Sequence, residues 1–346
     1  MFKRSTTLVL GAAASFEFGL PLGSTLLKSI ADKLNINFQH GRDQISGSNE
    51  IWSALAQIAQ RTNQNPNMLR AVALRIREAA QTARSIDNAI HINNDDQFVA
   101  VVAKLAICQC ILEAERKSKL RINRENPFAL NWAELSETWA YWFAQMLTTD
   151  VQKSDIESIF DNLTIITFNY DRTIERLMPL LLVQTYGIQP KEAEEIVQNK
   201  LRVYHPYGQV GSLDYWKQTP VTVPFGRVEL VALEQVSQGI LTFTEQVTDQ
   251  YSDLPSIRKA VQETEQIIFL GFGYHDQNMT LLQPEFDCRA DYVRGTVYEE
   301  PAAAIQPITK AIKHMLSQTE DHRTHPELVG YQCWQFMKEY YRPITW

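Results

Sequence analysis

Residues 6–15, with the sequence TTLVLGAAAS, join a short run of β-branched and apolar residues to a turn made of small residues. A segment with helical character follows at residues 24–34. A strand, a tight turn and a helix in this order form the unit from which parallel α/β sheets are built. The sequence therefore predicts the first strand and the first helix of such a sheet here.

Runs of the same kind recur at residues 163–168 (LTIITF), 201–204 (LRVY), 267–270 (IIFL) and, more weakly, 296–298. They are continuously apolar instead of alternating, which is typical of strands in a parallel sheet that is covered on both faces. Helical segments at 172–184 and 256–264 separate them. The pattern predicts an α/β fold with a Rossmann-like, doubly wound parallel sheet.

The interval between the first two strands is different, because its periodicity is helical from about residue 50 to residue 147. We expect a large helical insertion at residues 41–154, beside a sheet domain made of residues 1–40 and 155–300. A stretch at 41–48 with Gly, Ser and Asn is predicted to be a linker. The tail, residues 301–346, has the pattern of amphipathic helices that pack on the core or on a partner.

The composition limits the class of protein. The chain has 346 residues, 45% of them hydrophobic, which is enough for one large domain or two. A formal net charge of −7 argues against direct nucleic-acid binding. No run approaches the length of a membrane-spanning helix, so we expect a cytoplasmic protein without membrane contact. Cys108 and Cys110 point to different faces of one predicted helix and are interpreted as buried free thiols.

Small or polar residues follow the predicted strands, at the edge where open parallel sheets bind ligands. They are residues 11–15 with 18–23 (FGLPLG), Asn169 and Asp171 in NYD, His205 in HPYG, and residues 271–278 (GFGYHDQN). Small residues let backbone N–H groups approach a pyrophosphate, and a histidine exchanges a proton near neutral pH. Each group also has a structural explanation: packing for the small residues, helix capping for Asp171 and Asp276, and a hydrogen-bonded core position for His205.

Together these motifs resemble the sirtuin-like domain of bacterial NAD-consuming enzymes, many of which act in defence against phages. The resemblance runs from Thr6 to about Asn278, and the Asn-Tyr-Asp segment is its most specific part. It implies that the chain takes NAD as its substrate, without a metal. Asn169 and Asp171 would hold the nicotinamide ribose and the carboxamide, and His205 would be the catalytic base. The residues implied to line the dinucleotide pocket are Gly11, Ala12, Ala13, Ser15, Phe18, Pro21, Gly271, Gly273 and Asp276.

The chain departs from the family pattern at two positions. The family usually has Gly-Ala-Gly-Ala-Ser at the first turn, and the added methyl of Ala13 could weaken NAD binding or shift its pose. The usual His-Gly is His-Pro-Tyr-Gly here, which alters the turn that presents His205. The chain also has no Cys-x-x-Cys, the spacing of the zinc module in classical sirtuin deacylases, so hydrolysis is favoured over deacylation.

We therefore expect an NAD glycohydrolase that releases nicotinamide and ADP-ribose. Because unregulated loss of NAD would harm the cell, we expect a gated effector of antiphage defence, with a regulatory or sensor subunit or a homo-oligomer as its partner. Two alternatives stay open: a non-catalytic sensor or regulatory subunit that binds NAD or ADP-ribose, and transfer of ADP-ribose to a macromolecule. The sequence does not distinguish NAD from NADP.

Overall fold

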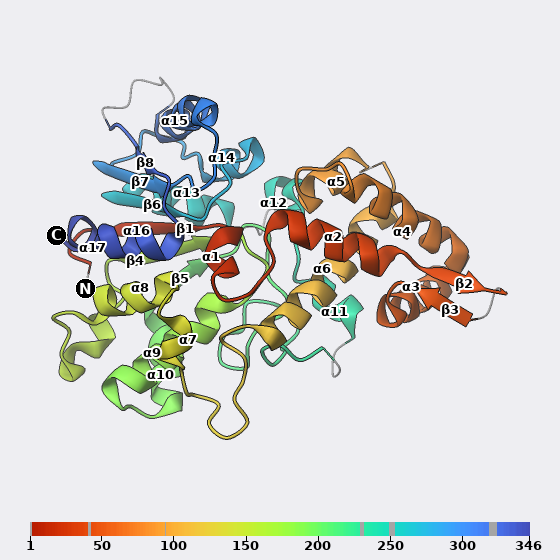
Figure 1. Ribbon diagram of the computed structural model, residues 1–346, viewed down its shortest axis with the longest axis horizontal. Coiled ribbons are helices and arrows are strands. Elements are labelled where there is room, and N and C mark those ends of the chain that lie inside the picture. Colours follow the sequence, from red (N-terminus) through yellow and green to blue (C-terminus); the bar gives the residue numbers. More distant parts are fainter. Residues whose placement is uncertain (1, 41–42, 94, 229–231, 249–252, 318–323) are drawn as a thin grey trace.

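The computed structural model describes residues 2–40, 43–93, 95–228, 232–248, 253–317 and 324–346 (Figure 1). Its centre is a sheet formed by β1 (Thr6–Leu10), β4 (Leu163–Thr167), β5 (Arg202–Tyr204), β6 (Gln266–Leu270), β7 (Tyr292–Thr296) and β8 (Glu327–Val329). All pairs of neighbouring strands in this sheet are parallel. The predicted α/β, Rossmann-like fold class is confirmed.

The spatial order of the strands is β5-β4-β1-β6-β7-β8, which is 3-2-1-4-5-6 when the sheet strands are numbered along the chain. This is the order of the Rossmann fold. Leu10 at the end of β1 lies between Thr167 of β4 and Leu270 of β6, so the residues after these three strands emerge side by side. The direction of the connections reverses between β1 and β6, which is the position where such sheets bind ligands.

Helices pack on both faces of the sheet, and alternate strand residues contact them (Figure 1). Leu8 and Leu10 of β1 belong to one core with α8 (Trp139–Thr148), α9 (Thr173–Tyr186), α10 (Pro190–Lys200) and α16 (Cys333–Glu339). Val9 belongs to a second core with α13 (Leu254–Glu263), α14 (Asp276–Leu282) and α15 (Ala302–Leu316). Burial from both sides explains why the central strands are apolar throughout.

The chain between β1 and β4 forms most of a helical lobe that extends away from the sheet (Figure 1). We define the lobe as α2 (Gly23–Leu34), α3 (Asn49–Arg61), α4 (Pro66–Ala80), α5 (Ile86–Ile92) and α6 (Gln97–Lys117), with the hairpin β2 (Asn37–Gln39) and β3 (Asp43–Ser46) at its outer end. Its apolar side chains belong to the same core as Val9, so the core continues from the sheet into the lobe.

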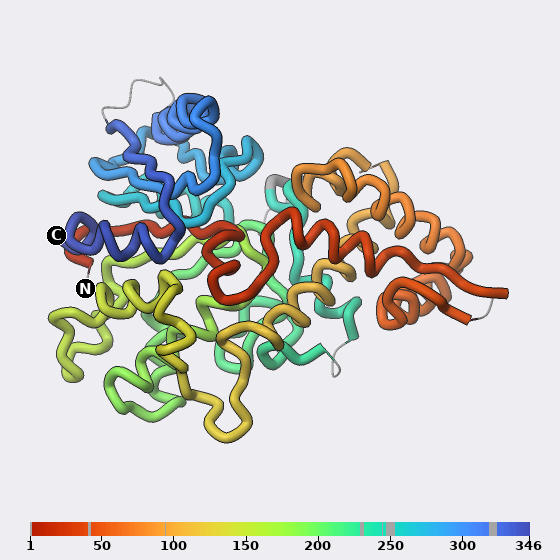
Figure 2. The backbone as a smooth tube through the Cα atoms, in the orientation of Figure 1, coloured from red at the N-terminus to blue at the C-terminus, as the bar shows by residue number. Residues whose placement is uncertain are grey.

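Shorter helices complete the described chain. They are α1 (Ala12–Phe16), α7 (Trp132–Leu135), a 3-10 helix at Lys153–Ser158, α11 (Leu233–Ser237), α12 (Phe243–Thr248) and α17 (Tyr341–Thr345). The first described residues and α17 lie side by side (Figure 2), with the Lys3 ammonium 5.5 Å from the centre of the Trp346 ring.

Several elements differ from the sequence-based predictions. A helix, α1, begins at Ala12, where a tight turn was predicted. The strand β3 occupies residues 43–46 of the predicted linker, of which residues 41–42 lie outside the described residues. The tail contains β8 where only helices were predicted. The weakest predicted strand, at residues 296–298, corresponds to β7, which begins four residues earlier than predicted. Runs of three or four residues are too short for their periodicity to be read, and Arg294 with Gly295 interrupts the apolar character of β7.

The helix α6 corrects the prediction about membrane-spanning segments. By length and composition it could cross a membrane, but 61% of its apolar window is buried inside the structure. It packs against α2, α4 and α11, and its paired charges include Lys104 with Glu245, Glu113 with Lys33 and Glu115 with Arg172. It is the core helix of the helical lobe, and its two cysteines are buried free thiols, as predicted.

Candidate functional site

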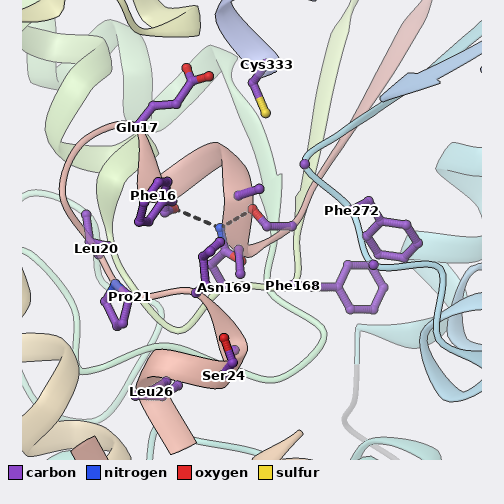
Figure 3. Close-up of a pocket in the computed structure, with 18 of the residues that line it drawn as sticks. Phe16, Glu17, Leu20, Pro21, Ser24, Leu26, Phe168, Asn169, Phe272 and Cys333 are labelled. Atoms are coloured by element: carbon purple, nitrogen blue, oxygen red, sulfur yellow. Dashed lines mark hydrogen bonds between the residues drawn. The ribbon is translucent and has the colours of Figure 1, made fainter. Parts of the chain in front are cut away.

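A cavity of about 900 Å³ lies at the carboxyl ends of β1, β4, β6 and β7 (Figure 3). Most of the predicted site residues line it, namely Gly11, Ala12, Ala13, Ser15, Pro21, Asn169, Asp171, Gly271 and Gly273. Residues 84–87 at the start of α5 and residues 331–334 also line it. The cavity therefore spans the position between β1 and β6 where the connections reverse.

The side chain of Asn169 is fixed by the first turn of the sheet (Figure 3). Its Nδ2 donates to the carbonyl oxygen of Gly11 at 2.9 Å and to Oγ of Ser15 at 2.8 Å. Because a carbonyl oxygen only accepts, this contact determines which end of the amide faces Gly11. The side chain is therefore oriented before any ligand arrives, with its Nδ2 already engaged by the protein.

The carboxylate of Asp171 holds the turn between β4 and α9. Its Oδ1 accepts from the backbone N–H of Thr173 at 3.0 Å. Burial raises the pKa of Asp171, and hydrogen bonds from Thr173 and Ser15 counteract part of that rise. Ser15 thus connects Asn169 with Asp171. The Asp171 carboxylate binds the first residue of α9, but the N-cap position itself is Arg172, so the prediction that Asp171 is the N-cap is one residue off. Its predicted contact with the nicotinamide carboxamide stays a prediction.

Gly11 and Gly271 allow two backbone turns to touch. A Cβ atom on Gly11 would lie 2.3 Å from the carbonyl oxygen of Gly271, and one on Gly271 would lie 2.4 Å from the nitrogen of Ala14. The backbone N–H of Ala13 donates to the same Gly271 oxygen at 3.2 Å. The N–H of Ala13 is therefore already hydrogen-bonded to the protein. The two glycines are required first of all for the close contact between the turns that follow β1 and β6.

His205 lies behind Asn169 and is 7% exposed. Its Nδ1 lies 3.1 Å from the backbone oxygen of Asn169, and its Nε2 lies 2.8 Å from Oε1 of Glu175 on α9. Burial lowers the pKa of His205, but the charge of Glu175 and these hydrogen bonds outweigh burial and leave the pKa raised. A raised pKa means that the surroundings of His205 favour the protonated ring over the neutral one. This geometry favours the core interpretation of His205, and its role as a base stays a prediction.

Phe18 and Asp276, which were also predicted to line the pocket, lie elsewhere. Phe18 is fully buried in the core and its ring makes an edge contact with Trp139, at 5.8 Å between ring centres. Asp276 is exposed at the first residue of α14, whose N-cap position is occupied by His275 without a capping hydrogen bond from its side chain. The structure therefore assigns Phe18 to packing, and it leaves Asp276 outside the cavity wall.

Two sets of contacts hold the loops around the cavity. Glu17 accepts from the backbone N–H groups of Trp139 at 2.7 Å and Trp334 at 2.9 Å, which joins the starts of α8 and α16 to the loop after α1. Arg172, directly after Asp171, forms a fully buried ion pair with Glu115 of α6. Glu115 also accepts from the backbone N–H of Arg172 at 3.0 Å. The helical lobe is thereby connected to the turn that carries Asn169.

The sequence reasoning missed a carboxylate that the helical lobe contributes. Asp87 of α5 lines the cavity, and its Oδ1 accepts from the Tyr170 hydroxyl at 2.6 Å. Burial raises the pKa of Asp87 to about 6. Only Tyr170 lies within a motif that the sequence analysis quoted, and no local spacing indicates that a residue 83 positions earlier contacts it.

Aromatic side chains form one part of the cavity wall. Phe168 lies 5.1 Å from Phe272 and 5.8 Å from Tyr207, measured between ring centres, in edge-to-face contacts. The Tyr207 hydroxyl donates to Oδ1 of Asn278 at 2.8 Å. Flat apolar surfaces with a few fixed polar atoms are typical of sites that bind the bases of nucleotides.

No protein-family model matches the chain, and no curated protein matches it in sequence. The fold and the cavity define the class: a Rossmann-like α/β protein with a ligand-sized cavity at the position where its sheet reverses direction. The resemblance to sirtuin-like domains rests on the motifs alone.

Proposed function

We propose that the cavity binds NAD and that the protein hydrolyses the bond between nicotinamide and ribose. The observation that carries this proposal is the position of the cavity at the carboxyl ends of β1 and β6, in a sheet with the strand order 3-2-1-4-5-6. Sheets of this order bind dinucleotides at this position. A volume of about 900 Å³ is near the upper end of the range for ligand pockets, which suits a dinucleotide.

The chemistry of the wall supports a division of the cavity between the two halves of the ligand. The nicotinamide ribose is proposed to lie beside Asn169, whose Oδ1 would accept from a ribose hydroxyl. The aromatic wall of Phe168 and Phe272 would contact the nicotinamide ring. Arg84 and Lys119, which also line the cavity, supply positive charge for the diphosphate.

The proposed reaction needs little acid catalysis. Nicotinamide leaves as a neutral molecule from a cationic ring, while positive charge develops on the ribose in an oxocarbenium-like transition state. A protein accelerates such a step by orienting the ribose, by placing a water molecule and by offering negative charge. The fixed amide of Asn169 and the carboxylates of the wall are suited to these tasks.

A second candidate function has its own support. With Nε2 of His205 engaged by Glu175 and the N–H of Ala13 bonded to Gly271, the protein could bind NAD or ADP-ribose as a sensor or regulatory subunit without cleaving it. In either case we propose a gated, cytoplasmic component of antiphage defence with a protein partner, and this part rests only on the resemblance.

Incubation of the purified protein with NAD tests the proposal, with nicotinamide and ADP-ribose followed by chromatography. We expect release of both products in equal amounts. Replacing Asn169 by Ala should lower the rate by about 100-fold or more, as for other groups that stabilise a transition state. The matched control is Asn131→Ala, since Asn131 is exposed and does not line the cavity. Nicotinamide release at the native rate by Asn169→Ala would contradict the proposed site, and NAD binding without any release would favour the sensor.

A further inference from the structure

The helical lobe contributes to the cavity as well as supporting it. The segment from Arg84 to Asp87, at the start of α5, lines the same cavity as Asn169. Asp87 follows the N-cap residue Ser85 by two positions, so its place at the cavity is determined by the start of this helix. The lobe thereby brings a carboxylate to the edge of the sheet that carries the predicted motifs.

Asp87 is held in a defined position. The Tyr170 hydroxyl donates to its Oδ1 at 2.6 Å, a short distance of the kind found when the acceptor is ionised. Tyr170 directly follows Asn169 at the end of β4, so one turn presents the fixed amide and the donor that orients Asp87. Asp87 is partly exposed, whereas His205 is almost fully buried.

We propose that Asp87 is the catalytic base of the NAD hydrolysis. The inference rests on the proposed function. A water molecule attacks C1 of the nicotinamide ribose, and its proton passes to the Asp87 carboxylate. The bond between C1 and the pyridinium nitrogen breaks, and its electron pair stays on the nitrogen, so neutral nicotinamide leaves. The products are nicotinamide, ADP-ribose and a proton, which Asp87 then releases to solvent.

The protonation of Asp87 supports this assignment. Burial raises its pKa to about 6, so it is ionised at neutral pH and is more basic than an ordinary carboxylate. The hydrogen bond from Tyr170 opposes this rise. Among the described residues, Tyr170 and Tyr207 are titratable groups that interact with Asp87. The elements packed against α5 carry further charged or titratable groups, which include Lys28, Asp32 and Lys33 on α2, Arg77 and Glu78 on α4, Lys104 and Cys108 on α6 and Glu245 on α12, and the segment itself carries Arg84 and His91.

The test combines NAD binding by calorimetry with the pH dependence of nicotinamide release, for the native protein, Asp87→Asn, Asp87→Glu and Tyr170→Phe. In the native protein we expect kcat/KM to fall tenfold per pH unit below about pH 6, because the base becomes protonated. Asp87→Asn should bind NAD within about threefold of the native affinity but lose about 100-fold or more in kcat. Asp87→Glu should restore part of the rate. Asn88→Ala, on the same helix and outside the cavity wall, is the matched control.

Tyr170→Phe separates a base from a merely structural residue. Removing the hydrogen bond that lowers the pKa of Asp87 should move the acid limb of the pH profile to higher pH. A residue that acts only through folding would change stability or KM and leave the limb in place.

The outcomes for the base and for the proposed function differ. If the native protein cleaves NAD and Asp87→Asn cleaves it within threefold at every pH, the base assignment is wrong and the hydrolase stands. NAD binding by the native protein without nicotinamide release at any pH also overturns the base assignment and leaves binding in place. If the native protein does not bind NAD, the proposed function fails and the inference fails with it.

Discussion

Replacing Asp87 by Asn should make the protein more stable at neutral pH and leave its stability almost unchanged in acid. Burial raises the pKa of Asp87 from 3.8 to about 6, so the folded state binds a proton more tightly than the unfolded state. The native protein then loses stability as pH rises from about 4 through 6. At about 1.4 kcal/mol per unit of pKa shift, the loss above pH 7 amounts to about 3 kcal/mol.

An asparagine keeps the hydrogen bond from Tyr170 but does not titrate, so the variant avoids this loss. The assay is urea denaturation between pH 3.5 and pH 8, the range chosen to bracket the two pKa values. The difference in the free energy of unfolding between variant and native should grow from near zero to about 3 kcal/mol across this range. The matched control is Asp287→Asn, at an exposed carboxylate, where we expect a small difference at every pH. A difference for Asp87→Asn that does not change with pH would refute the reasoning.

Three further predictions concern the framework of the site. Glu115→Gln should lower the free energy of unfolding by about 3–5 kcal/mol, because it leaves a buried arginine without its counter-charge; Glu113→Gln, at a partly exposed pair on the same helix, should cost about 1 kcal/mol or less by urea denaturation. Gly271→Ala and Gly187→Ala have the same positive φ of 61°, which costs about 1–2 kcal/mol, but only the first meets backbone, so we expect it to lose about 1–3 kcal/mol more in thermal denaturation. His205→Gln should destabilise the protein most below pH 6.5 and less as pH rises through the raised pKa of this histidine, because the charged form is the one that the fold stabilises; a pH-independent effect would contradict a buried imidazolium.

The central strands and the position of the cavity could be predicted because they depend on local features. β1, β4 and β6 are fully buried, so each is a short apolar run bounded by turn residues. Parallel pairing then brings the residues after them to one edge, which is why Gly11, Asn169 and Gly271 meet in the structure.

The remaining contacts depend on residues that are distant in the sequence. Asp87 lies 83 positions from Tyr170, and Glu115 lies 57 positions from Arg172, so no periodicity or spacing relates the partners. The sequence could place His205 after a strand, but the contact with Glu175 arises from the way α9 packs beside β5. The short strands β2, β3 and β8 were missed because three or four residues carry no readable period.

Calorimetric titration of NAD into the native protein and two tryptophan variants tests the central claim most directly. Ser24, in the first turn of α2, lines the cavity (Figure 3), so Ser24→Trp should fill part of it. The neighbouring Thr25 is exposed and lies outside the cavity wall, so Thr25→Trp is the matched control. We predict one NAD per native chain, an unchanged affinity in Thr25→Trp, and an affinity at least about tenfold lower in Ser24→Trp, a loss of about 1.4 kcal/mol or more. No binding to the native protein, or equal binding by both variants, would contradict the assignment of this cavity to NAD.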